Sequence, residues 1–185
     1  MDDLIRVSKR LSLVLRHRPE TIGVTLDPQG WVDVDVLLAA LAAHGVPLDR
    51  ATLDRVVAGN DKQRFAVRTG PDGRDQIRAS QGHSVAVDLG LDDRPPPPRL
   101  FHGTAATAVP AILREGLVKR RRHAVHLSLD VHTARRVGAR RSGSVAVLAV
   151  DAAAMAAAGH RFQCSANGVW LTDHVPPTFI RRLNA

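Results

Sequence analysis

An arginine and a histidine stand next to each other, as Arg16 and His17, shortly before Pro19. On a helix, which turns about 100° per residue, Lys9, Ser12 and Arg16 fall within about 60° of one another and line one face. An ammonium, a hydroxyl and a guanidinium group on one face suit a phosphate, which accepts several charge-assisted hydrogen bonds. The simpler alternative is a solvent-exposed basic face on an ordinary helix, and this spacing does not exclude it.

Five other short polar clusters could contribute to a binding site. Each falls where a helix or strand is expected to begin or end. They are residues 60–64, 81–84, 102–104, 126–128 and 165–168. Scaffolds place functional side chains at such positions, but polar residues also face water there, so each cluster alone has a purely structural alternative.

His102 and His126 lie on stretches that we expect to be neighbouring strands, close to glycine or small hydroxyl residues. Small neighbours would let a ligand approach the backbone, and the imidazoles could donate hydrogen bonds to ribose hydroxyls. A metal site is the alternative explanation. Because no carboxylate or third histidine recurs at ligand spacing, we expect no metal.

The second half of the chain has few acidic residues. Its carboxylates are Glu115, Asp130, Asp151 and Asp173, and none of them lies inside a polar cluster. We therefore do not expect a pair of carboxylates to act there as general acid and base. The single cysteine, Cys164, excludes a disulfide framework, and we interpret it as a small buried or half-buried residue.

The elements that must position these groups begin with an N-terminal amphipathic helix. Its apolar face comprises Leu4, Val7, Leu11, Val14 and Leu15. Asp2 or Asp3 can cap its start, and Pro19 forces its end because proline disfavours helical geometry in the residue before it. Ile5 is the one apolar residue that interrupts the basic face.

Two further helices and a hairpin are expected in the first half. The apolar spacing predicts one helix that follows Asp33 and stops at Gly45, and a second over about 50–58 that Gly59 closes. Residues 65–68 and 76–79 read as strands around a Pro-Asp-Gly turn. Helices followed by a hairpin indicate a small winged-helix-like α+β lobe, which often binds nucleic acid.

The second half alternates short strands and helices. We expect strands at about 100–102, 124–128, 144–150, 161–164 and 169–171, and helices at about 107–114, 132–139 and 152–157. Neither a G-x-G-x-x-G nor a Walker pattern occurs, so the sequence supports neither a Rossmann fold nor a P-loop.

Charge changes along the chain at a proline-rich segment. Residues 1–98 carry 13 basic and 14 acidic side chains and residues 99–185 carry 13 and 4, which gives net charges of −1 and +9. Residues 95–98 are all proline, which favours an extended spacer. We therefore divide the chain into residues 1–94, a linker at 95–99 and residues 100–185, and expect the last part to bind an anion.

The composition is that of a soluble, cytoplasmic protein, which we expect to be a monomer. No stretch is apolar enough to span a bilayer, and the N-terminal helix lacks the apolar region of a signal peptide. With 3% aromatic residues and no tyrosine, stacking on aromatic side chains is not expected to dominate the recognition of single-stranded nucleic acid.

Seven motifs, taken in order, resemble those of a known family. They are L-S-x-x-L-R-H-x-P (11–19), N-D-K-Q-R-F (60–65), I-R-A-x-Q-G-H-S (77–84), H-G-T (102–104), V-H-L-S (125–128), V-G-x-R (137–140) and N-G-V-W-L-T (167–172). Together they closely resemble the NAD-dependent RNA 2′-phosphotransferases, the tRNA-splicing or KptA-like family. The resemblance implies an α+β fold, with an N-terminal winged-helix-like RNA-binding lobe and a C-terminal ADP-ribosyltransferase-like lobe of mixed α/β structure that binds NAD.

The resemblance also implies a two-step reaction. An internal RNA 2′-phosphate attacks the anomeric carbon of the nicotinamide ribose of NAD, which expels nicotinamide and leaves the RNA phosphate ADP-ribosylated. The ribose 2″-hydroxyl then attacks that phosphate, which releases RNA with a free 2′-hydroxyl and ADP-ribose 1″,2″-cyclic phosphate.

Site residues follow from the same resemblance. The family's catalytic set corresponds to Arg16, His17, Arg64 and Arg140, with Lys9 and Ser12 in support of the phosphate. Residues placed around NAD, which is a co-substrate, are His102, Gly103, Thr104, Arg122, His126, Leu127, Ser128, Ser165, Asn167 and Gly168. We expect Arg16, His17 and Arg64 to clamp the 2′-phosphate, and Arg140 to stabilise the second transition state.

Two other functions are compatible with parts of the sequence. An ADP-ribosyltransferase that caps the terminal phosphates of nucleic acids would share the NAD pocket and stop after the first step. A winged-helix regulator without enzymatic activity would concentrate its basic residues in the first lobe, whose net charge is −1. The run at residues 119–122 is more basic than the corresponding stretch of the family. Arg122, which ends this run, is the residue that we place on the adenosine side of the NAD pocket.

Overall fold

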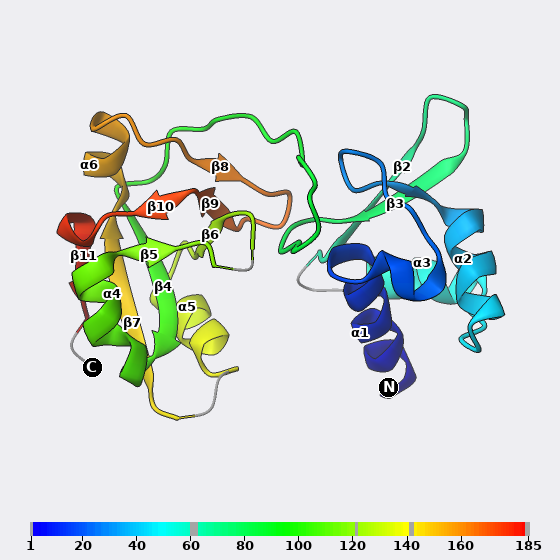
Figure 1. The fold of residues 1–185 in the computed structure, drawn as a ribbon, viewed down its shortest axis with the longest axis horizontal. Helices are drawn as coiled ribbons and strands as arrows, with labels where there is room; N and C mark the ends of the chain where they lie inside the picture. The colour runs from blue at the N-terminus through cyan, green and yellow to red at the C-terminus, as the bar shows by residue number, and fades with distance from the viewer. Residues whose placement is uncertain (1, 60–62, 121, 141–142, 184–185) are drawn as a thin grey trace. The chain divides into compact units, whose positions relative to one another are not determined.

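The chain folds as two units, Met1–Gly90 and Leu91–Ala185, each of which combines helices with small antiparallel sheets (Figure 1). The structure is a computed structural model, and it describes residues 2–59, 63–120, 122–140 and 143–183. Six α-helices occur within these ranges, so the mixed α and β class that the sequence predicts is confirmed.

Three α-helices dominate the first unit: α1 (Asp2–Arg16), α2 (Val34–Ala43) and α3 (Arg50–Ala58). Aspartates cap the latter two, because the Asp33 carboxylate accepts hydrogen bonds from the first turn of α2 and Asp49 does the same for α3. Helix α1 ends before Pro19, which opens the 3₁₀ helix η1 (Pro19–Ile22). The three helices confirm the prediction from apolar spacing.

A three-stranded antiparallel sheet completes the first unit. Its strands are β1 (Val32–Asp33), β2 (Phe65–Thr69) and β3 (Asp75–Ala79), in the order β1-β3-β2. The β2–β3 hairpin was expected from its turn residues, and its register pairs Phe65 with Ala79 and Thr69 with Asp75. Strand β1 was not expected, because two residues carry no readable periodicity.

The apolar face of α1 is the centre of the first core. Leu11, Val14 and Leu15 are fully buried. They belong to one cluster with side chains from α2, α3 and the sheet, which include Leu37, Leu41, Leu53, Val56, Phe65 and Ile77. Burying this face fixes the rotation of α1, so its opposite face is presented away from the core.

Three small sheets form most of the second unit. One has the order β11-β7-β4, with β4 (Arg99–Ala105), β7 (Val145–Asp151) and β11 (Ile180–Arg182). Another has the order β6-β9-β8, with β6 (Val125–Leu127), β8 (Gln163–Cys164) and β9 (Trp170–Thr172). The third pairs β5 (Leu117–Val118) with β10 (His174–Val175).

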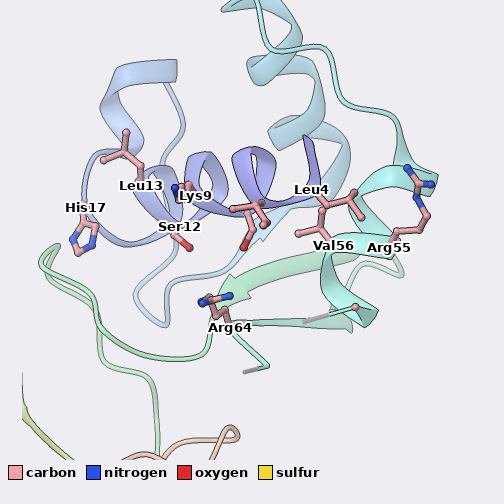
Figure 2. A pocket seen from close by; sticks show the side chains of 11 residues that line it. Leu4, Lys9, Ser12, Leu13, His17, Arg55, Val56 and Arg64 are labelled. Carbon is pink, nitrogen blue, oxygen red and sulfur yellow. The ribbon is translucent and has the colours of Figure 1, made fainter. Parts of the chain in front are cut away.

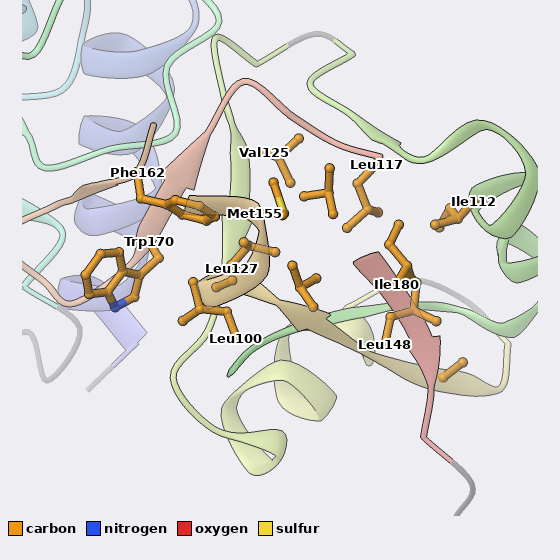
Figure 3. Packing of buried hydrophobic residues seen from close by; sticks show 14 of the residues in the cluster. Leu100, Ile112, Leu117, Val125, Leu127, Leu148, Met155, Phe162, Trp170 and Ile180 are labelled. Atoms are coloured by element: carbon orange, nitrogen blue, oxygen red, sulfur yellow. The ribbon is translucent and has the colours of Figure 1, made fainter. Parts of the chain in front are cut away.

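Helices α4 (Val109–Glu115), α5 (Val131–Gly138) and α6 (Ala152–Ala157) connect these strands, together with two short 3₁₀ helices, η2 (Ala106–Ala108) and η3 (Pro177–Phe179). Asp130 and Asp151 cap α5 and α6 by accepting hydrogen bonds from their first turns. Side chains from the sheets and helices meet in a single buried cluster, in which Leu100, Leu127 and Leu148 lie together (Figure 3).

The predicted helices and longer strands of the second unit are confirmed with small shifts of their ends. Strands β5, β10 and β11, which have two or three residues each, were not expected.

The proline-rich segment is attached to the second unit by hydrogen bonds. The Arg94 amide donates to the Phe162 carbonyl at 2.7 Å, and the Pro98 carbonyl accepts from the amide at the start of α6. Among the residues described, no helix is both long and apolar enough to cross a membrane.

Helix α5 packs directly on the backbone of β4 at two glycines. A Cβ atom added at Gly103 would lie 1.7 Å from the Ala134 carbonyl oxygen and 2.9 Å from the Gly138 nitrogen. One added at Gly138 would lie 2.8 Å from a Val145 methyl group and 3.0 Å from the Thr104 nitrogen. Backbones this close leave no room for a side chain, so both glycines are needed to seat α5.

Gly103→Ala is therefore expected to displace α5 and to lower the free energy of unfolding of the second unit by about 3 kcal/mol. The reverse change on the same strand, Ala105→Gly, only removes a methyl group and should cost about 1 kcal/mol or less. Urea denaturation of both variants measures the difference. Equal stabilities would contradict the close packing described above.

Candidate functional site

A groove of about 650 Å³ lies in the first unit (Figure 2). Its walls come from the outward face of α1, from α3, and from the residue that precedes β2. The residues that line it are Leu4, Ile5, Ser8, Lys9, Ser12, Leu13, His17, Arg55, Val56, Gly59 and Arg64. Four predicted phosphate ligands, Lys9, Ser12, His17 and Arg64, therefore share one groove.

The fifth predicted ligand, Arg16, contacts the groove through the backbone of Arg64. Its Nη2 atom donates to the Arg64 carbonyl oxygen at 3.2 Å. The same oxygen accepts from the Ser80 amide at 2.9 Å. The Arg16 guanidinium thus ties the end of α1 to the start of β2, and leaves the Arg64 side chain to line the groove.

The segment after β3 packs against the end of α1. The Arg16 carbonyl accepts from the amides of Ser84 and Val85 at 2.8 and 3.3 Å. The Nδ1 atom of His17 shares a hydrogen bond of 2.9 Å with the Ser84 hydroxyl, which orients the imidazole at the groove. Gly82, with a φ of 88°, lies over the Arg16 guanidinium. Three motifs distant in sequence therefore meet at one place.

The groove has the electrostatic character of an anion site. Lysine, arginine and histidine side chains line it, together with the hydroxyls of Ser8 and Ser12, and no carboxylate is among its described lining residues. Guanidinium and ammonium groups donate strong hydrogen bonds to phosphate oxygens, and hydroxyls add neutral ones. The arrangement can bind and orient a dianionic phosphate.

Sequence reasoning missed the apolar end of the groove and the contribution of α3. Val56 and Arg55 reach it only through the packing of α3 beside α1, which no local pattern reports. Ile5 did carry a signal, because it interrupts the basic face of α1. Residues 60–62, the first part of another motif, lie outside the described residues.

In the second unit, strands β4 and β6 bring His102 and His126 together. Phe101 and Ser128 exchange backbone hydrogen bonds of 2.9 and 2.8 Å across the two strands. Next to them, Nδ1 of His102 donates to the His126 carbonyl at 3.0 Å. The expected proximity of these two strands is confirmed.

His126 is held as a neutral imidazole. Burial, reinforced by the charge of Arg122, lowers its pKa to about 3. Its Nδ1 atom donates to the Ala124 carbonyl at 3.0 Å, so the lone pair is on Nε2. That atom is buried and has no hydrogen-bond partner within the described part of the chain. It can therefore accept a hydrogen bond from a ligand hydroxyl, the reverse of the donation that we expected.

The turn between β8 and β9 uses its polar residues internally. The Ser165 hydroxyl lies 2.7 Å from the Asn167 side-chain oxygen and 3.0 Å from the Val169 carbonyl, and it also accepts from the Val169 amide. Gly168 has a φ of 74° and donates to the Ser165 carbonyl. These contacts make the turn rigid.

Other predicted ligands take up diverse positions in the second unit. Thr104 is buried on β4, Leu127 lies in the core, and Ser128 is half-buried beside β4. Arg122 is exposed before β6, and Arg140 is exposed in the turn that follows α5. No cluster of three potential metal ligands occurs among the residues that the structure describes.

Comparison with known proteins places these features in a family. A family model described as "RNA 2'-phosphotransferase, Tpt1 / KptA family" matches residues 2–174. A protein of Streptomyces coelicolor is 58% identical over 177 residues, which cover 96% of this chain and 94% of the relative. A protein of Trichormus variabilis is 52% identical over 180 residues, with 97% of each chain covered. Both carry the name "Probable RNA 2'-phosphotransferase".

The lowered pKa of His126 predicts a specific loss of stability in acid. Between pH 6.5 and 3 the unfolded chain binds a proton that the folded chain does not, so the free energy of unfolding falls as the pH falls. The slope is about 1.4 kcal/mol per pH unit at most. His126→Asn keeps a donor for the Ala124 carbonyl but has no imidazole to titrate. The fall in the free energy of unfolding that His126 causes in acid should therefore be absent in this variant.

Urea denaturation between pH 4 and 7 tests the prediction, with His132→Asn, which removes an exposed imidazole, as the matched control. An unchanged pH dependence in His126→Asn would show that the imidazole is not held neutral.

Proposed function

Because the chain belongs to the Tpt1/KptA family of RNA 2′-phosphotransferases, and is therefore a transferase, we propose that it transfers an internal RNA 2′-phosphate to NAD-derived ADP-ribose. The products would be RNA with a 2′-hydroxyl, nicotinamide and ADP-ribose 1″,2″-cyclic phosphate. The observation that carries the proposal is the gathering of Lys9, Ser12, His17 and Arg64 in one groove that no described carboxylate lines.

In this proposal the groove holds the 2′-phosphate. Arg64, His17 and Lys9 contact its oxygens directly, with a hydrogen bond from Ser12. Arg16 completes the clamp from the end of α1, where its contact with the Arg64 carbonyl fixes its position. A phosphate dianion is already a nucleophile, so the first step needs orientation and charge compensation more than it needs a general base.

We propose the second unit as the NAD site. The buried Nε2 of His126 fits a ribose hydroxyl, which can donate to it. His102, Ser128 and Arg122 lie on or beside the same strands and would hold the rest of the dinucleotide. NAD supplies the anomeric carbon that the phosphate attacks and nicotinamide as the leaving group. Gly103 and Gly138 seat α5, and so place Arg140 at the end of that helix.

The two units would then act as a winged-helix-like RNA-binding lobe and an ADP-ribosyltransferase-like lobe. Helices followed by the β2–β3 hairpin support the first assignment. Small antiparallel sheets around a common core, with the histidine pair between β4 and β6, support the second. Family membership supports both.

Arg64→Ala tests the phosphate clamp while it keeps the backbone contact with Arg16. The contact with Arg16 uses the Arg64 carbonyl, so alanine keeps it while the guanidinium is lost. We expect kcat for a 2′-phosphorylated RNA to fall by about 100-fold or more. Arg6→Ala, an exposed arginine of α1 outside the groove, should retain activity. A loss of less than threefold in Arg64→Ala would contradict the clamp.

Arg140→Ala tests the assignment of the second step. If Arg140 stabilises the charge that develops when the ribose hydroxyl attacks the phosphate, its loss leaves the first step intact. RNA that carries ADP-ribose on its 2′-phosphate should then accumulate, as seen by mass spectrometry of the RNA. Arg136→Ala on α5 is the control. Failure of the variant to consume NAD would instead assign Arg140 to the first step.

A further inference from the structure

One end of the groove carries apolar side chains, with Arg55 beside them, and nothing in the proposed phosphate site uses these apolar side chains. Leu4 and Val56 lie together at the end of the groove away from His17, as Figure 2 shows. Ile5, which lines the same groove, is 52% exposed. Single exposed isoleucines are common on protein surfaces. Ile5 differs from such residues because it lines a groove that Lys9, His17 and Arg64 also line.

The spacing along α1 connects the apolar end with the cationic part. Ile5, Ser8, Lys9 and Ser12 stand at i, i+3, i+4 and i+7, so they line one stripe of the helix, and all four line the groove. The rise of an α-helix places Ile5 about 10 Å along the axis from Ser12. A phosphate held near Ser12 therefore leaves room in the groove for a further chemical group beside it.

We propose that this apolar end receives the ribose and base of the nucleotide that flanks the 2′-phosphate in the RNA strand. The inference rests on the proposed function, because it takes the cationic part of the groove as the phosphate site. A flanking nucleotide is joined covalently to the phosphate-bearing one, so it must lie next to that site. Its base has an apolar face that can cover Ile5 and Val56 without loss of a hydrogen bond.

The apolar part of this contact would be tolerant of sequence. The apolar side chains that form it, Leu4, Ile5 and Val56, offer no hydrogen-bonding groups to the edge of a base, so they cannot distinguish one base from another. The contribution to binding is the removal of apolar surface from water, and it is available to any flanking nucleotide. A substrate without a flanking nucleotide would lack this contribution to binding.

The test compares two substrates in two matched variants. Ile5→Ala removes most of the apolar side chain but favours helix, and Val36→Ala removes an equally exposed valine, 50% accessible, from α2 outside the groove. The substrates are a short oligoribonucleotide with one internal 2′-phosphate and a mononucleotide with a 2′-phosphate. Both are assayed at saturating NAD.

We expect Ile5→Ala to raise KM for the oligoribonucleotide about fivefold with kcat unchanged, and to leave KM for the mononucleotide as in the unmodified protein. Ile5→Leu should restore the lower KM, and Val36→Ala should change neither substrate. An unchanged KM in Ile5→Ala, or an equal rise for both substrates, would overturn the proposal.

Failure of the proposed function would look different. In that case the unmodified protein would turn over neither substrate. Binding of the same fluorescently labelled oligoribonucleotide, measured by anisotropy without NAD, still decides the role of Ile5. Weaker binding by Ile5→Ala than by Val36→Ala supports the apolar contact, and equal binding by the two variants overturns it.

Discussion

The carbonyl oxygen of Arg64 accepts two hydrogen bonds, from the Arg16 guanidinium and from the Ser80 amide, and the candidate phosphate site depends on this junction. It joins the end of α1, the start of β2 and the end of β3, which carry three separate motifs. The hydrogen bond between His17 and Ser84 closes the same junction from the other side. With these backbone contacts in place, the side chains of α1 and Arg64 form one cationic surface before any ligand arrives, as electrostatic catalysis requires.

The second unit also depends on close contacts between backbone segments. Helix α5 lies so close to β4 that Gly103 and Gly138 must lack side chains, and the β4–β6 contact sets two histidines side by side. Burial keeps His126 neutral, so a hydrogen-bond acceptor is available in a part of the chain with net charge +9. In both units, close backbone contacts position a few polar side chains.

Much of this organisation was readable in the sequence. The apolar face of α1, the apolar spacing that predicts α2 and α3, and the hairpin turn are local signals, and the structure confirms them. Helical spacing and the motifs together also identified four groove residues, which are Lys9, Ser12, His17 and Arg64. The contribution of Arg55 and Val56 could not be predicted, because it depends on how α3 packs beside α1. The sequence could not show which ring nitrogen of His126 carries the proton, because only the contact with the Ala124 carbonyl reveals it.

The most direct measurement of the central claim uses the unmodified protein, NAD and a short RNA with one internal 2′-phosphate. Mass spectrometry follows both the RNA and the nucleotide products. The account predicts that the RNA loses its phosphate while nicotinamide and ADP-ribose cyclic phosphate appear in equal amounts. An RNA that is unchanged after NAD has been added, or one that ends with ADP-ribose attached, would contradict it.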